Sequence, residues 1–173
     1  MNKYKLLALI LFCITFKCGA QTRIAVLDFQ LNDLTLLANT QTELQRTASM
    51  APLLIESLNL NDDYHAISIP STLQAAANNN FADFYHFPAQ SAKLGRQLNV
   101  DWMVISQHIK PSFLFSYLQV LLIDVNKETQ VARYDIELKG SHAKVTQHSI
   151  MALAKKLQAT LSEPSHHIAS PIP

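Results

Sequence analysis

The stretch that decides the fold is DWMVISQHIKPSFLFSYLQVLLIDVNKETQVARYDIELK, residues 101–139. It opens with an apolar strand from Trp102, which the segment Lys110-Pro111-Ser112 turns into a second strand over Phe113–Val125. This second strand is apolar at odd and even positions, so we expect both faces to be covered and the strand to lie in the middle of a sheet. The third strand, Ala132–Leu138, alternates apolar and charged residues, which predicts one buried and one solvated face. Together the strands predict an antiparallel meander.

The residues before this stretch predict strands and helices in alternation. Arg23–Phe29 is a short apolar run typical of a buried strand, and Tyr64–Ile69 is a second strand. Between them, a polar connector leads to Thr40–Leu60, where apolar residues spaced three and four apart predict an amphipathic helix. Pro52 interrupts that helix, so we expect a kink there or a stable part that begins near Ser49.

Further helices are predicted on both sides of the meander. Ser71 is a candidate cap for a short helix over Leu73–Ala77, and Pro88 suits the first turn of a helix that runs to Leu98. After Gly140, a last helix places one apolar face inward, made of Ile150, Leu153, Ala154, Leu157 and Leu161. The resulting order, β-α-β-α-α-β-β-β-α, predicts an α/β (α+β) fold: a mixed sheet with parallel first strands, a C-terminal antiparallel meander, and helices packed on the sheet in two or three layers.

The amino terminus has the plan of a secretory signal peptide. A positively charged start precedes an apolar run from Leu6 to Phe16, which is too short to span a bilayer, and small residues lead to Ala20. We expect cleavage after Ala20 and a protein located in the periplasm. Lipidation is not expected, because Phe12 and Lys17 stand before the two cysteines where a lipidation motif needs a small residue.

The domain prediction follows from these signals. We expect a signal peptide over residues 1–20, a single α/β domain over 21–161, and a disordered tail over 162–173, where proline and polar residues collect. Both cysteines leave with the signal, so thiol chemistry and cysteine-ligated metal are excluded from the mature protein.

Charge and glycine content exclude further classes. Three of the 14 basic residues lie in the signal, which leaves 11 against 13 acidic residues, a net charge of −2. Nucleic-acid binding needs a basic stripe, and this chain has none. With only three glycines in 173 residues, it also lacks the glycine-rich loops that cradle phosphates.

Four segments carry a family resemblance: Val26–Asp33, Leu94-Gly95, Val100–Val104 and Asp135–Gly140. The first is similar to the Asp-Phe-x-Leu-x-Asp opening, and the other three to the second half, of a family of small secreted proteobacterial proteins of unknown function. The resemblance implies a fold like the amino-terminal domain of periplasmic TolB and like the curli-secretion lipoprotein CsgG. The chain departs from the family in lacking the cysteine pair before the Leu-Gly element and the later tryptophan.

Few residues suggest chemistry. Asp28 and Asp33 follow the first strand, where ligands of mixed sheets bind, so they are the candidate ligand-binding residues, against the alternative that they only end a strand and cap a turn. Ser106 and His108 alternate on one strand face, which is more typical of a polar patch than of a catalytic dyad. Seven histidines are present, and their spacing along the chain predicts no metal site. Convergence of His65, His86 and His108 from separate elements is the alternative, and no cofactor is expected.

An aromatic segment is the candidate partner-binding surface, with packing over the core as the alternative. Its members are Phe81, Phe84, Tyr85 and Phe87. The sequence thus favours a non-catalytic accessory or interaction module of the cell envelope that binds another protein. The alternatives are a periplasmic small-ligand-binding protein with a pocket near Asp28 and Asp33, and an enzyme of unknown class. The sequence does not identify the partner, the ligand or the oligomeric state.

Overall fold

The computed structural model of the chain describes residues 21–36, 40–140 and 143–163. The predicted signal peptide, its cleavage site after Ala20, and the tail from residue 164 onward lie outside these residues. A mixed sheet of six strands runs in the order β3-β1-β4-β5-β6, with β2 paired to β4 beside β1. The strands are β1 Thr22–Val26, β2 Gln30–Asp33, β3 Tyr64–Ser68, β4 Trp102–Lys110, β5 Ser116–Asp124 and β6 Thr129–Leu138.

The strand directions are those that the sequence predicts. β1 pairs in parallel with β3 on one side and with β4 on the other. β4 pairs antiparallel with β5, and β5 pairs antiparallel with β6, so the meander is confirmed. The parallel pairing of β1 and β3 requires a crossover, which the helices between them provide.

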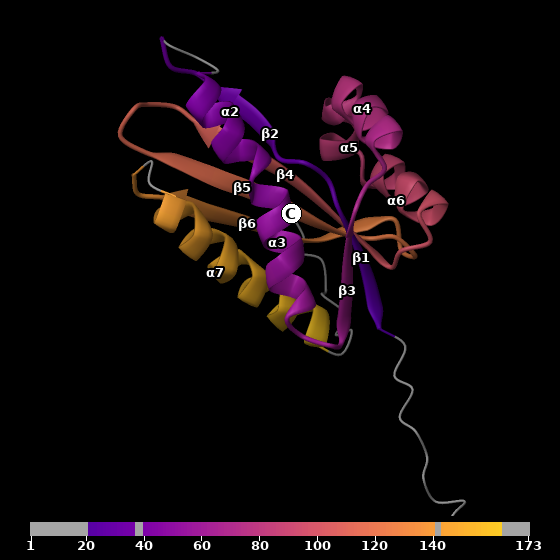
Figure 1. Cartoon of the computed structure of the whole chain (residues 1–173). Coiled ribbons are helices and arrows are strands. Elements are labelled where there is room, and N and C mark those ends of the chain that lie inside the picture. The colour runs from indigo at the N-terminus through magenta and orange to yellow at the C-terminus, as the bar shows by residue number, and fades with distance from the viewer. Residues whose placement is uncertain (1–20, 37–39, 141–142, 164–173) are drawn as a thin grey trace, which may run out of the picture.

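Helices cover both faces of the sheet, which gives three layers (Figure 1). They are α2 Gln41–Ala48, α3 Met50–Asn59, α4 Ser71–Asn79, α5 Phe81–His86, α6 Pro88–Gln97 and α7 Ala143–Ser162. α3 and α7 pack side by side on one face, and α4, α5 and α6 lie over the other. None of the helices in the described ranges combines the length and the apolar character that crossing a bilayer demands.

Each face of the sheet has its own apolar core. Along β5, Leu118, Val120 and Leu122 pack toward α3 and α7, whereas Leu121 and Ile123 pack toward α4–α6. The apolar residues at odd and even positions therefore fill two different cores, as a strand covered on both faces requires. The prediction that both faces of this strand are covered is confirmed.

Some local features differ from the predicted order or add to it. The polar connector after β1 contains the short strand β2, whose Gln30–Asp33 pairs in register with Gln107–Lys110 of β4. The aromatic segment forms the additional helix α5. The chain breaks between α2 and α3 at Ser49, so the expected helical part that begins near Ser49 is confirmed. Pro52 lies in the first turn of α3, where its missing N–H has no helical partner to lose. β5 begins at Ser116, so Phe113–Phe115 belong to the loop before it.

We expect Gly95 in α6 to be intolerant of a side chain. A Cβ at this position would lie 2.5 Å from Val125 Cγ2 and 3.0 Å from Met103 Cγ, because the helix approaches the sheet closely there. Although alanine is the better helix former, Gly95→Ala should lower the free energy of unfolding by about 1–3 kcal/mol through overpacking. Urea denaturation measures this change, with Lys93→Ala on the exposed face of the same helix as the control. Equal stability of the two variants would contradict the close approach.

Candidate functional site

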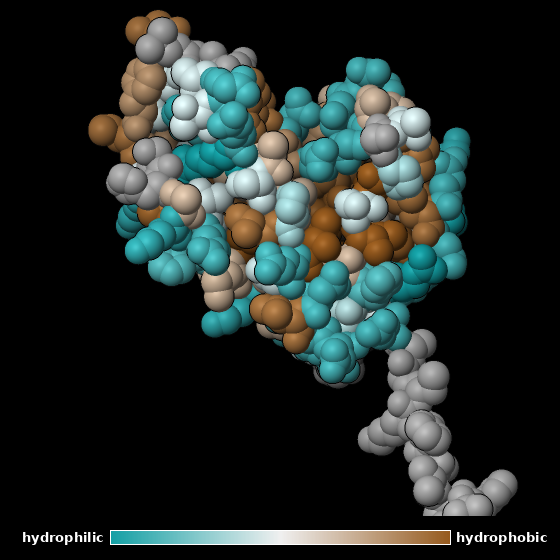
Figure 2. All heavy atoms as spheres, in the orientation of Figure 1, coloured by the Kyte–Doolittle hydropathy of each residue, from teal (hydrophilic) through white to brown (hydrophobic). Residues whose placement is uncertain are grey.

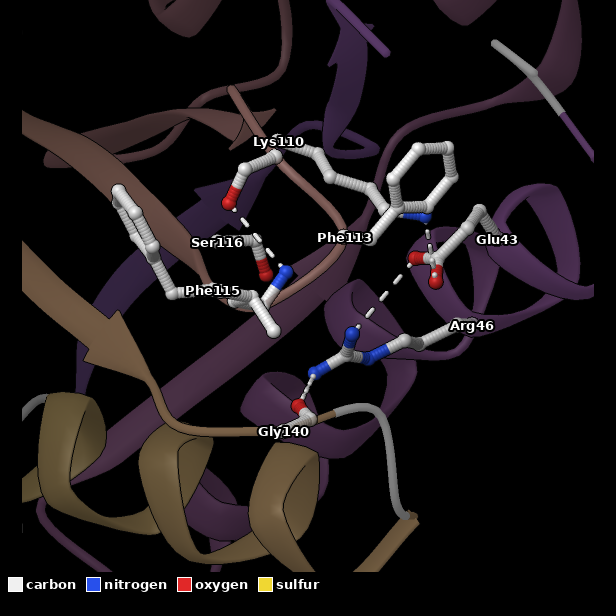
Figure 3. Close-up of a pocket in the computed structure, with 9 residues that line it drawn as sticks. Glu43, Arg46, Lys110, Phe113, Phe115, Ser116 and Gly140 are labelled. Atoms are coloured by element: carbon white, nitrogen blue, oxygen red, sulfur yellow. Dashed lines mark hydrogen bonds and ion pairs between the residues drawn. The ribbon is translucent and has the colours of Figure 1, made fainter. Parts of the chain in front are cut away.

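A buried group of charged side chains lies where β2 and β4 end. Asp33 and Lys110 are register partners at the last positions of these two strands. Lys110 Nζ lies 3.0 Å from Glu43 Oε1 of α2 (Figure 3). It also lies 3.9 Å from Asp33 Oδ2. Asp33 also accepts hydrogen bonds from the backbone N–H and the hydroxyl of Thr35. Strand pairing thus delivers an acid and a base to one place, and α2 adds a second acid.

Arg46 joins this group to the opposite end of the chain. Its guanidinium lies 3.6 Å from Glu43 Oε2 and donates a hydrogen bond to the carbonyl oxygen of Gly140 (Figure 3). It donates a second hydrogen bond to Thr146 Oγ1. Burial lowers the pKa of Arg46 from its ordinary value, and the charge of Glu43 opposes that change. α2, the end of β6 and the start of α7 are therefore held together by one cation.

His108 uses both ring nitrogens inside the protein. Nδ1 lies 2.7 Å from Thr47 Oγ1, and Nε2 lies 2.9 Å from Ser116 Oγ. Because the Thr47 hydroxyl donates its proton to the Glu43 carbonyl oxygen, Thr47 accepts from Nδ1–H and Ser116 donates to Nε2. Burial, assisted by the positive charge of Arg46, lowers the pKa of His108 to about 4. His108 is a neutral, fully satisfied structural group.

The space beside these residues is small. A cavity of about 10 Å³ is lined by the charged groups, by the loop Ser112–Phe115 and by Gly140. That volume is at the lower limit for one water molecule, so no organic ligand fits. In Figure 3 the Phe113 ring lies beside Lys110, with Nζ 5.7 Å from the ring centroid, and Phe115 points away from the charges. We refer to Asp33, Glu43, Arg46, His108 and Lys110 as the polar cluster.

The two candidate carboxylates lie in different surroundings. Asp28 is exposed and lines a hollow of about 470 Å³ between the β1–β2 connection, α2 and α4. Figure 2 shows the hollow as the notch between the two upper lobes. The backbone N–H of Asp28 donates to Gln74 Oε1, which anchors the connection to α4. Asp33 does not line this hollow, because its carboxylate is buried in the polar cluster.

The candidate aromatic residues divide into buried and exposed members. Phe81 belongs to the core under α5 and stacks on Tyr85, whose hydroxyl is hydrogen-bonded to Gln119. Phe84 is half-buried and lines a hollow of about 220 Å³ between α4 and α6. Phe87 is 58% exposed. Packing over the core therefore accounts for Phe81, and Phe84 and Phe87 face outward in part or in full.

The remaining polar candidates stay apart. His65 and His86 are exposed on β3 and α5, away from buried His108. Within residues 21–36, 40–140 and 143–163, no three histidine, cysteine, aspartate or glutamate side chains gather as a metal site would need. Ser106 is buried, and its hydroxyl finds no hydrogen-bond partner among the residues that the structure describes. His108 bonds Thr47 and Ser116 instead.

Sequence reasoning missed most of the polar cluster. It singled out Asp33 and His108 but not Glu43, Arg46 or Lys110. The available signal was a lysine at the end of an apolar strand, together with an acid and an arginine three residues apart on the predicted helix. A charge at the end of a buried strand indicates a paired charge, but not which partner it finds.

We expect the neutral His108 to make stability fall in acid. The pKa of His108 is about 4 in the folded protein and about 6.5 in the unfolded chain, so the unfolded chain binds more protons between these values. The free energy of unfolding should therefore fall by about 3 kcal/mol from pH 6.5 to pH 4 through this residue alone.

Urea denaturation of the wild type and His108→Gln across this range measures the effect. The variant should have a flatter pH profile, whereas His65→Gln, at an exposed histidine, should follow the wild type. Parallel profiles for the wild type and His108→Gln would contradict the burial of a neutral imidazole.

Comparison with solved structures finds similar folds at low sequence identity. TolB from Acinetobacter baumannii matches with a TM-score of 0.52 and 14% identity, over 82% of this chain and 28% of TolB. A PelC dodecamer from Paraburkholderia phytofirmans has a TM-score of 0.48 and 12% identity, over 84% of this chain and 90% of that chain. Lipoprotein GNA1162 from Neisseria meningitidis has a TM-score of 0.48 and 13% identity, over 82% of this chain and 99% of that chain. The expected TolB-like fold is confirmed, whereas the likeness to CsgG stays a prediction.

Sequence comparison gives a family but no characterised relative. No curated protein matches the chain. One family model matches residues 22–157, which extend from the first residue of β1 to the last buried leucine of α7. A family of unknown function is what the resemblance in the sequence implied. The chain belongs to the family DUF3280, whose description is protein of unknown function (DUF2380).

Proposed function

We propose that the protein is a non-catalytic accessory module of the bacterial cell envelope that binds another protein. It acts in the periplasm after removal of residues 1–20, and its partner-binding surface lies over α5 and α6. The observation that carries the proposal is Phe87, which is 58% exposed on the connection between these two helices. Aromatic side chains that a partner can bury are among those that contribute most to the binding energy of protein–protein contacts.

The surroundings of Phe87 support this surface. The neighbouring hollow of about 220 Å³ is lined by Leu73, Phe84 and Leu94, with Gln90, Lys93 and Gln97 among its polar members. Apolar side chains with polar residues around them are the usual composition of a protein–protein contact. The hydroxyl of Ser91 donates to the carbonyl oxygen of Phe84, which fixes the α5–α6 corner before any partner arrives. A preformed surface loses little conformational entropy on binding.

The polar interior supports a role without catalysis. Both nitrogens of His108 are occupied, and the charges of Glu43 and Lys110 face each other. A general base must reach a substrate proton with a free nitrogen or oxygen atom, and these groups are used within the fold. The cavity of about 10 Å³ beside them admits no substrate.

Site-specific crosslinking in periplasm tests the proposal. A photoreactive residue at position 87 should give one discrete crosslinked product, because a partner covers Phe87. The same residue at Leu60, which is 81% exposed at the far end of α3, is the matched control and should give none. Phe87→Ser should also lose co-purification of the crosslinked protein. Equal crosslinking at both positions, or none at 87, counts against this surface.

The hollow beside Asp28 favours a second function, small-ligand binding. Its volume of about 470 Å³ is in the range of ligand sites, and the exposed carboxylate of Asp28 lies at the carboxyl end of β1. Asp33 takes no part, because its carboxylate faces Lys110. The ligand of such a site is a small cationic or hydroxyl-bearing molecule.

Thermal unfolding with a panel of amines, polyols and sugars checks this second function. A true ligand raises the unfolding temperature of the wild type, and Asp28→Asn should abolish that rise because it removes the carboxylate charge. Asp62→Asn, at an exposed acid in a turn, should keep the full rise. A response that survives Asp28→Asn would place the ligand elsewhere.

A further inference from the structure

A second exposed apolar surface lies across the hollow beside Asp28. Helices α5 and α6 lie on one side of this hollow, and the second surface lies on the other. It consists of Leu34 and Leu36, which follow β2, and of Phe113, Leu114 and Phe115 in the β4–β5 loop, and we refer to it as the apolar tip. Leu36 is 98% exposed and Leu114 is 85% exposed. Figure 2 shows hydrophobic residues projecting at the upper left, where Figure 1 has the ends of β2 and the loop between β4 and β5.

Strand pairing brings the two halves of the tip together. The backbone N–H of Leu34 donates to the carbonyl oxygen of Lys110, one position beyond the last β2–β4 register pair. The loop then continues from Lys110 to Phe113, whose ring lies against the lysine ammonium group. Five large apolar side chains from segments 80 residues apart in sequence therefore project from one end of the sheet.

The tip carries no charge of its own. From Leu34 to Thr42, and again from Pro111 to Ile123, the sequence contains no charged residue. The charges at its base are those of the polar cluster, where Lys110 faces Glu43 and Asp33. Contact with an apolar medium therefore requires no desolvation of an unpaired ion, which is the largest cost of such contact.

Three backbone N–H groups of the tip are hydrogen-bonded within the protein. Leu34 N–H is bonded to Lys110, Thr35 N–H to Asp33 Oδ1, and Leu114 N–H to Ser112 Oγ. In the bilayer interior each unbonded backbone group costs free energy, so local bonds of this kind make insertion possible.

We propose that the apolar tip inserts into the interfacial region of a lipid bilayer and holds the domain on a membrane surface. The tip is convex and uncharged, which suits a deformable medium, and leucine and phenylalanine are the side chains that interfacial segments bury. Insertion to a depth of about 5–10 Å covers the five side chains of the tip and leaves the polar cluster at the boundary. This contact is independent of the partner surface at Phe87, so either proposal stands if the other fails.

Fluorescence from a tryptophan in the tip tests the proposal by position. Trp102 is the chain's single tryptophan, so Trp102→Phe gives a silent background in which Leu114→Trp reports the tip and Leu60→Trp reports the other end of the sheet. Leu60 is a matched control, because it is an equally exposed leucine beside the starts of β1 and β3. With phosphatidylcholine vesicles, we expect a blue shift and quenching by brominated acyl chains at position 114 and neither at position 60.

A binding measurement completes the test. Vesicle flotation of the mature protein should fall roughly tenfold or more when Phe113, Leu114 and Phe115 are all changed to serine, since three large apolar side chains are lost from the contact. Leu60→Ser should float as the wild type does, and circular dichroism checks that both variants are folded. Segment 1–20 is absent from the mature protein and so does not contribute.

Three outcomes overturn the proposal. Position 114 could stay open to aqueous iodide in the presence of vesicles. The blue shift could occur without vesicles and grow with protein concentration, which would mean that a second copy covers the tip. Quenching could be equal at positions 114 and 60, which would mean that binding has no fixed orientation.

Discussion

The structure depends on the burial of β4 on every side. This strand pairs with β1 and β2 along one edge and with β5 along the other, so its backbone groups are bonded over nearly its whole length. Val104 fills the core under α3 and α7, and Met103 and Ile105 fill the core under α4–α6. β4 therefore contacts strands on both edges and contributes side chains to the apolar cores on both faces of the sheet. Along one edge of β4 the partner changes from β1 to β2. The connection between these two strands lines the notch, and the residues that follow β2 form part of the apolar tip.

The polar cluster is a consequence of that same burial. β4 ends with His108 and Lys110 inside the protein, and a buried charge must be paired or it destabilises the fold. α2 supplies Glu43 and Arg46, and β2 supplies Asp33, so two short elements are fixed through ion pairs and not through apolar contacts alone. These elements are also those that shape the notch and the tip. The polar cluster therefore supports the notch and the apolar tip, but its charged groups are part of neither surface.

The sequence predicted the parts of the fold that depend on local periodicity. The alternation in Ala132–Leu138 and the doubly apolar run in β5 gave the meander, and the three-four spacing gave the helices that pack as α3 and α7. β2 was missed because a strand of four residues with two polar positions has no periodic signal, and only pairing with β4 makes it a strand. Phe113–Phe115 were assigned to β5 because apolar character was taken as burial, whereas these side chains are exposed in a loop.

The candidate sites were harder to predict for the same reason. Asp28 and Asp33 are five residues apart, and an extended chain separates two such positions by about 16 Å, so closeness in sequence does not bring their carboxylates together. β2 intervenes, so one carboxylate faces the solvent and the other faces Lys110. Of the aromatic residues, Phe81 is buried in the core and Phe87 is exposed. The amino-acid composition of the segment does not predict this difference. Which side chains meet is decided by the edge partners of β4, and no local pattern encodes that choice.

The position of α7 has a consequence for how the chain acquires its structure during synthesis. The core over Ile24 and Val26 of β1 includes Ile150, Leu153 and Leu157, so the first strand completes its packing with nearly the last residues made. Tyr64 and Tyr134 also donate hydrogen bonds to this helix, from strands at the two outer edges of the sheet. Without α7, α3 alone covers this face of the sheet, and Ile150, Leu153 and Leu157 are missing from its core. The apolar core on this face of β1 is therefore complete only when α7 is packed against the sheet.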